Sequence, residues 1–130
     1  MNGKGVDMAK TLVLIGSICA FLGIALGAFG AHALRERLPA DLMAVYQTGV
    51  LYHLVHALAL VLTGALLRWM GATVLVTWAG WLFLAGIVLF SGSLYLLSMT
   101  GIRALGAITP FGGLSFLIGW ALLAVAAWKG

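Results

Sequence analysis

Charge is scarce in this 130-residue chain, where 8% of residues are Asp, Glu, Lys or Arg and 64% are hydrophobic. An ordinary soluble domain carries about 25% charged residues, so that class is excluded. Acidic residues are the scarcer of the two charge types. The three acids, Asp7, Glu36 and Asp41, all lie outside the apolar runs. No carboxylate pair can therefore meet at membrane depth for acid–base catalysis. We expect no catalytic residues and no enzyme activity.

Cysteine and proline are rarer still, with one and two residues. Cys19 is the single cysteine, which excludes a disulfide within the chain and is interpreted as a small residue packed in a helix. No Asp or Glu lies at membrane depth beside the histidines, so the usual ligand sets for a metal are incomplete. We therefore expect neither a metal site nor a bound cofactor.

Long apolar runs fill the remaining sequence. Each is close to the roughly 20 residues that a membrane-crossing helix needs. The runs predict an all-α, polytopic bundle of four transmembrane helices in a single domain, 11–130, after a polar tail, 1–10. The expected helices cover residues 11–33, 48–67, 73–99 and 110–128.

The connections carry turn and start signals. Pro39 and Asp41 fit the first turn of a short interfacial helix between the first two spans. Gly71 and Gly101 fit helix ends. The fourth helix either begins near Leu105 and kinks at Pro110, or begins at Pro110 with Thr109 as its cap, which is the interpretation we favour.

Small residues recur at helical spacing in the first and fourth spans. In lipid, such residues allow helix backbones to approach closely. The predicted packing faces are Gly16, Gly23, Gly27 and Gly30 in the first span, and Gly112, Ser115 and Gly119 in the fourth. These faces indicate tight helix–helix contact, within the chain, in a homo-oligomer or in a larger membrane complex.

Polar residues gather on one face of the second span. Tyr46, Gly49, His53, His56 and Thr63 recur at spacings of three, four, three and seven, and we call them the polar seam. Polar groups at membrane depth normally face the bundle interior. The favoured interpretation is that the histidines are hydrogen-bonded structural residues.

A second interpretation is that the histidines form a functional site. His32, at the end of the first span, lies at a depth near that of His53, so a site built from all three histidines is conceivable. Such a site would pass a proton or a small solute, or bind a metal, haem or quinone.

The basic residues mark the ends of the spans. This placement fits anionic head groups and topology signals, with no patch suited to nucleic acid. Four spans put Lys4, Lys10, Arg68 and Lys129 on one side and Arg35, Arg37 and Arg103 on the other. By four to three, the positive-inside rule places both termini in the cytoplasm.

Four motifs resemble a known family. They are GAFGAHALR (27–35), YQTGVLYHLVHALAL (46–60), FSGSLYLL (90–97) and ITPFGGLSFLIGW (108–120). In this order they are similar to the small bacterial inner-membrane proteins called domain of unknown function 423, which also include a small animal transmembrane protein. The resemblance implies four membrane helices and no assigned activity, so no catalytic residues carry over.

Three functions are consistent with these observations. The first is an accessory or structural membrane subunit that acts through helix–helix packing, surrounded by the lipid bilayer. The second is a proton or small-solute transporter that uses Tyr46, His53 and His56. The third is a haem- or quinone-binding redox subunit that uses His32, His53 or His56.

Overall fold

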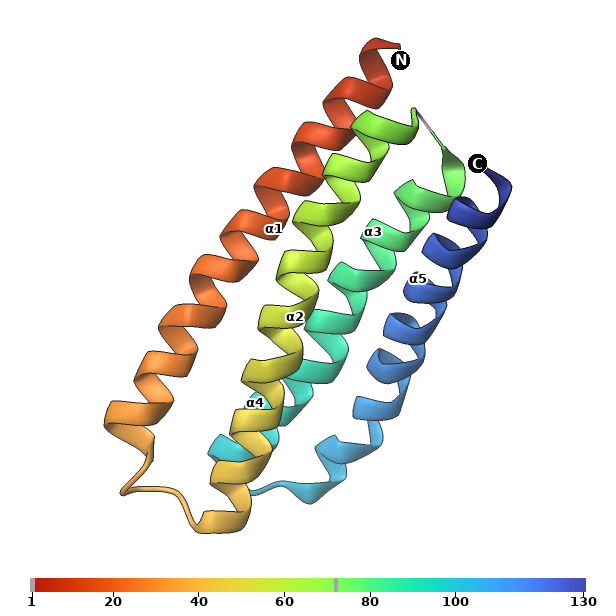
Figure 1. Cartoon of the computed structure of the whole chain (residues 1–130). Coiled ribbons are helices and arrows are strands. Elements are labelled where there is room, and N and C mark those ends of the chain that lie inside the picture. Colours follow the sequence, from red (N-terminus) through yellow and green to blue (C-terminus); the bar gives the residue numbers. More distant parts are fainter. Residues whose placement is uncertain (1, 72) are drawn as a thin grey trace.

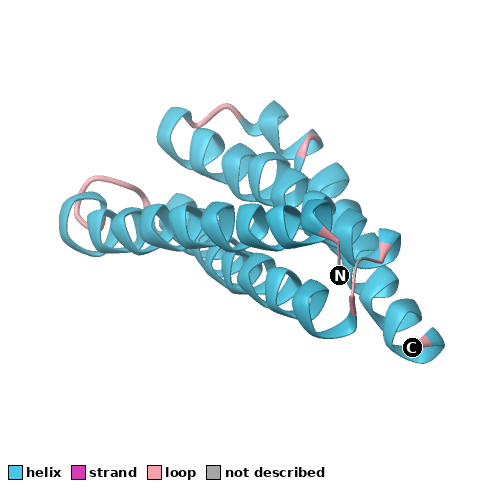
Figure 2. Cartoon of the chain, turned by 90° about the horizontal axis from the view of Figure 1, so that it is seen from above, coloured by secondary structure: helices cyan, strands magenta, loops and turns pink. Residues whose placement is uncertain are grey.

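A computed structural model describes residues 2–71 and 73–130, and its architecture is a bundle of long helices. Four helical segments are long and apolar enough to cross a membrane, which confirms the predicted fold class. The first is α1 (Gly3–Phe29), extended by the π-helical turn η1 (Gly30–Leu34), and the second is α2 (Ala40–Met70). Only short loops separate the helices (Figure 2).

The third and fourth segments are each composite. The third consists of α3 (Val74–Gly86), the π-helical turn η2 (Ile87–Ser91) and α4 (Gly92–Thr100). The fourth consists of the 3-10 turn η3 (Arg103–Ala107) and α5 (Thr109–Lys129). A π-turn adds one residue to the turn and so rotates the side chains that follow it.

The helices are not equally enclosed. α2 lies between α1 and the third segment, while α5 packs on α3 and η2 on the far side (Figure 1). In its most apolar stretch α1 is 17% buried, against 44% for α2. Both termini lie at one end of the molecule (Figure 1), so α1 is an edge helix and α2 the central one.

Helix ends follow local chemistry. Gly71 and Gly101 end α2 and α4 with φ values of 88° and 73°, a backbone region that glycine adopts without strain. Thr73 caps α3 by accepting a hydrogen bond from the Val76 N–H. Pro110 lies in the first turn of α5 as predicted. Thr109 does not cap that helix, because its hydroxyl bonds Ser93 Oγ at 2.6 Å.

Two expected boundaries differ in the structure. Residues assigned to the tail, 1–10, belong to α1 from Gly3 onward, because the Asn2 side chain accepts from the Gly5 N–H and starts the helix early. The expected interfacial helix is not a separate element. The chain from Ala40 to Thr48 contains no Gly or Pro, so helical hydrogen bonding continues directly into the membrane-crossing part of α2.

The predicted small residues pack inside the chain. A methyl group on Gly16 would lie 2.8 Å from the Val61 nitrogen and 2.9 Å from the Ala57 carbonyl oxygen. Gly112 lies directly against the backbone of Phe90, and Gly119 against the Phe83 ring. The small residues of α1 therefore pack on α2, and those of α5 on the third segment.

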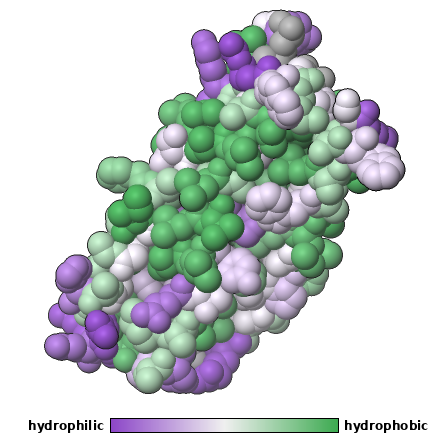
Figure 3. All heavy atoms as spheres, viewed as in Figure 1, coloured by the Kyte–Doolittle hydropathy of each residue, from purple (hydrophilic) through white to green (hydrophobic). Residues whose placement is uncertain are grey.

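Large apolar side chains cover the outside. An apolar belt covers the middle of the molecule and hydrophilic residues lie at its two ends (Figure 3). Such a surface matches a hydrocarbon layer bounded by two polar interfaces.

Candidate functional site

The polar seam of α2 is buried as its spacing predicts. Tyr46, Gly49, His53, His56 and Thr63 are all buried. They share one face of a continuous helix, because spacings of three, four and seven return to the same side. The seam thus faces the neighbouring helices of the same chain.

Tyr46 joins α2 to the end of α1. Its hydroxyl donates a hydrogen bond to the Leu26 carbonyl oxygen. The ring fits over Gly30, where any β-carbon would collide with it. Tyr95 of α4 lies beside it, with ring centroids 5.3 Å apart. Gly30 is therefore required for this contact as well as for close packing.

His53 joins three helices. Its Nε2 lies 2.8 Å from the Cys19 carbonyl oxygen of α1, and because a carbonyl only accepts, Nε2 carries the hydrogen. Its Nδ1 lies 2.8 Å from the Tyr95 hydroxyl of α4. Neutral His53 accepts from that hydroxyl, whereas a charged imidazolium would donate to it. Both hydrogen bonds can therefore exist in either protonation state.

His56 is bound in a different way. The Trp120 indole N–H of α5 donates to Nε2 at 3.0 Å, and because indole nitrogen only donates, Nε2 carries no hydrogen. Nδ1 therefore holds the hydrogen and donates to the Tyr52 carbonyl oxygen at 2.8 Å. The ring also stacks on Phe116, with centroids 3.5 Å apart. The Trp120 bond is compatible only with a neutral imidazole.

The three histidines are not brought together as one site. His32 is exposed on η1, outside the buried seam. It follows buried Gly30 by two residues, which places it on the opposite side of the helix. Across residues 2–71 and 73–130, no group of three His, Cys, Asp or Glu side chains has an arrangement suited to a metal ion. In this structure His32 therefore lies apart from the buried histidines of the seam.

Two partners of the seam were missed in the sequence. Tyr95 belongs to a polar row with Ser91, the last residue of η2, and Ser98 of α4. The spacings of four and three could have revealed it. Trp120 lies in the middle of α5, far from the interfacial belt where membrane tryptophans gather. A tryptophan at that depth needs a hydrogen-bond acceptor, which is the missed signal.

The π-turn η2 sets the relative orientation of the two halves of the third segment, α3 and α4. Before it, α3 packs mainly on α5, and after it α4 packs on α2. At its end the buried Ser91 hydroxyl donates to the Gly49 carbonyl oxygen at 2.7 Å. π-turns inside α-helices often lie at functional positions. This one brings Ser91 and Tyr95 to the polar seam.

A lateral hollow of about 550 Å³ opens beside His56. Its aromatic and histidine lining consists of Tyr52, His56, Phe90, Phe116 and Trp120. The Tyr52 side chain is 40% exposed, and its hydroxyl makes no hydrogen bond to any residue that the structure describes. The hollow has the size of small-molecule sites.

Comparison with known proteins identifies the family. The model of a family described as a protein of unknown function, DUF423, matches residues 26–113. The UPF0382 membrane protein YwdK of Bacillus subtilis (strain 168) is 51% identical over 120 residues, which cover 92% of this chain and 98% of the relative. The UPF0382 membrane protein SH2409 of Staphylococcus haemolyticus (strain JCSC1435) is 44% identical over 121 residues, 92% of this chain and 97% of its own. No solved structure matches.

The matched region contains the polar seam, the π-turn η2 and the start of α5. The resemblance found in the motifs is confirmed over nearly the whole chain. The chain is a member of the DUF423 family of uncharacterised membrane proteins.

Proposed function

We propose that this protein is a non-catalytic subunit of a bacterial inner membrane that associates laterally with other membrane helices, as a homo-oligomer or as an accessory part of a larger complex. One observation carries the proposal. All four ring nitrogens of His53 and His56 have hydrogen-bond partners within the chain. The buried polar groups hold the bundle together, which leaves the outer surface for function.

The edge helix α1 is the surface we assign to association. It packs mainly on α2 and leaves its opposite side uncovered, including Phe21 and Ile24. Ala25 and Ala28 are exposed on the same helix, and side chains this small allow another helix to approach closely. In lipid there is no hydrophobic driving force between helices, so their association depends on close packing of complementary surfaces.

Site-specific photo-crosslinking tests this assignment. A crosslinking side chain replaces Phe21 of α1, which is 74% exposed, or Leu117 of α5, which is 69% exposed and serves as the matched control. At native expression we expect a discrete protein adduct from position 21 and lipid adducts from position 117. The mass of the adduct distinguishes a second copy from another subunit. Lipid adducts alone at both positions would contradict the proposal.

The lateral hollow supports a second candidate, binding of a quinone-type ligand. Its aromatic walls suit a flat ring, and the Tyr52 hydroxyl can donate to a ring carbonyl. His56 would contribute stacking surface only, since both of its nitrogens already have partners. This binding site would be open to the lipid, where such ligands dissolve.

Quinone extraction from purified protein tests the second candidate. Tyr52→Phe removes the hydroxyl and keeps the ring, so we expect a several-fold lower quinone content at equal folded yield. Tyr46→Phe is the matched control, because its hydroxyl already bonds Leu26 and lies outside the hollow. Equal quinone content in the wild type and Tyr52→Phe would remove this candidate.

A further inference from the structure

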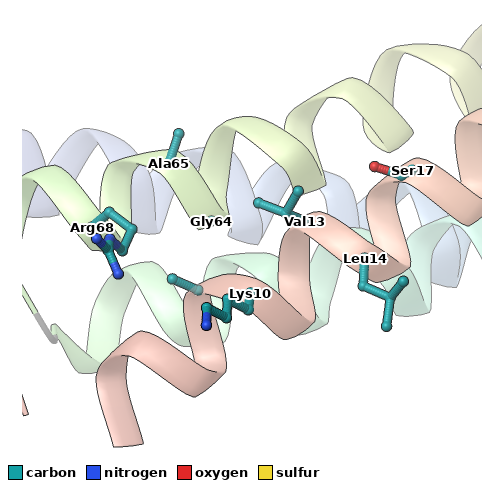
Figure 4. A pocket seen from close by; sticks show the side chains of 8 residues that line it. Lys10, Val13, Leu14, Ser17, Gly64, Ala65 and Arg68 are labelled. Carbon is teal, nitrogen blue, oxygen red and sulfur yellow. The ribbon is translucent and has the colours of Figure 1, made fainter. Parts of the chain in front are cut away.

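A second hollow, of about 560 Å³, lies between α1 and α2 near the end that carries the termini (Figure 4). Each helix contributes one cation, Lys10 from α1 and Arg68 from α2. Figure 4 shows both toward one end of the hollow and Ser17 toward the other. Between them Val13, Leu14 and Ala65 form an apolar wall.

The two cations have no acidic partner. Among residues 2–71 and 73–130 the ion pair is Arg103 with Asp41, at the opposite end of the molecule, and no carboxylate lies within 4.0 Å of Lys10 or Arg68. Asp7, one turn before Lys10, does not line the hollow. An unpaired Lys and Arg that line one hollow give it a positive potential, which attracts an anion.

The depth of the cations matches a membrane interface. Arg68 is two residues from the end of α2. Lys10 lies seven residues after the start of α1, so roughly 10 Å of that helix extends beyond it. Ser17 is roughly 10 Å farther along α1 in the other direction, toward the apolar belt. The hollow therefore runs from head-group depth into the hydrocarbon.

We propose that this hollow binds an anionic phospholipid of the surrounding leaflet. The phosphate lies between the Lys10 ammonium and the Arg68 guanidinium, whose planar fork suits phosphate oxygens. One acyl chain follows Val13 and Leu14 toward Ser17. Two cations with no carboxylate beside them favour a glycerol head group, because an ethanolamine ammonium would meet repulsion there. The site is independent of any partner on α1.

Native mass spectrometry of the purified full chain tests the site. Phosphatidylglycerol and phosphatidylethanolamine are added separately, and bound lipid is counted at increasing collision energy. For Lys10→Gln or Arg68→Gln, we expect about tenfold weaker retention of phosphatidylglycerol, the effect of losing one charged contact. Lys4→Gln and Lys129→Gln are matched controls at the same end, outside this hollow.

Ala65→Phe gives a second test that leaves both charges in place. Ala65 is exposed, so phenylalanine there fills the hollow without entering the core. We expect the same loss of phosphatidylglycerol with an unchanged melting temperature in detergent. Equal retention of the two lipids, or equal weakening by the Lys4 and Lys129 controls, would overturn the proposal. Crosslinking from position 21 is unaffected by either outcome.

Discussion

His53 and His56 lie one turn apart on α2 and are equally buried, yet their surroundings differ in kind. His53 bonds a carbonyl that only accepts and a hydroxyl that can donate or accept. His56 bonds a carbonyl that only accepts and an indole that only donates. The first environment tolerates both protonation states and the second only the neutral one. The two histidines share one helix face but are therefore not equivalent in the protonation states that their hydrogen bonds allow.

We expect the largest effect from a variant that separates α5 from the third segment, because α5 carries the Trp120 side chain that distinguishes the surroundings of His56 from those of His53. In Gly112→Ala the new methyl group meets the Phe90 backbone, which has little freedom to move. We expect a loss of about 3 kcal/mol in the free energy of unfolding, measured by circular dichroism in detergent, and loss of the Trp120 contact with His56.

Gly113→Ala is the control for that variant. Its β-carbon would lie 3.8 Å from the Phe90 ring, an ordinary contact. We expect wild-type stability. Because alanine is the better helix former, equal destabilisation by both variants would contradict the prediction that the contact with the Phe90 backbone sets the effect.

Removing the donor of His56 is the next largest change. Trp120→Phe keeps a ring in place and leaves Nε2 of His56 without its partner. We expect about 1–2 kcal/mol lower unfolding free energy, from an unpaired buried acceptor, by denaturant titration in mixed micelles.

Tyr95→Phe makes the parallel change at His53 and is expected to cost less, about 0.6 kcal/mol. His53 keeps its bond to Cys19 in this variant. A larger loss for Tyr95→Phe than for Trp120→Phe, in the same titration, would reverse the comparison.

His32→Ala is expected to have the smallest effect on stability, within about 0.5 kcal/mol, because the side chain is exposed. Gly27→Leu should lower the folded yield more, since even a β-carbon there lies 3.2 Å from Val50. Folded yield by gel filtration in detergent measures both. Comparable yields from the two variants would overturn this ranking.

The histidine tautomers of the wild-type protein provide a final test that needs no substitution. Nitrogen NMR of labelled histidine should show the hydrogen of His53 on Nε2 and that of His56 on Nδ1. The two residues would thus be opposite tautomers. Identical tautomers would refute the assigned bonding of one of them.

Periodicity was sufficient for some features and insufficient for others. The polar face of α2 and the ends at Gly71 and Gly101 follow from residue spacing and backbone freedom, which are local properties. The partner of His56 does not, because Trp120 is 64 residues away and its approach depends on how α5 packs. The turn η2 was also missed, since IVLFS carries no signal that separates a π-turn from an α-turn.

The π-turn η2 (Ile87–Ser91) allows the two halves of the third segment to pack on different helices. Residues before it pack mainly on α5, and residues after it pack on α2. Regular α-helical winding through these five residues would instead turn Ser91 and Tyr95 roughly 100° away from α2. The third segment therefore behaves as two short helices joined at a fixed angular offset, and its length is constrained residue by residue even though its composition is only apolar.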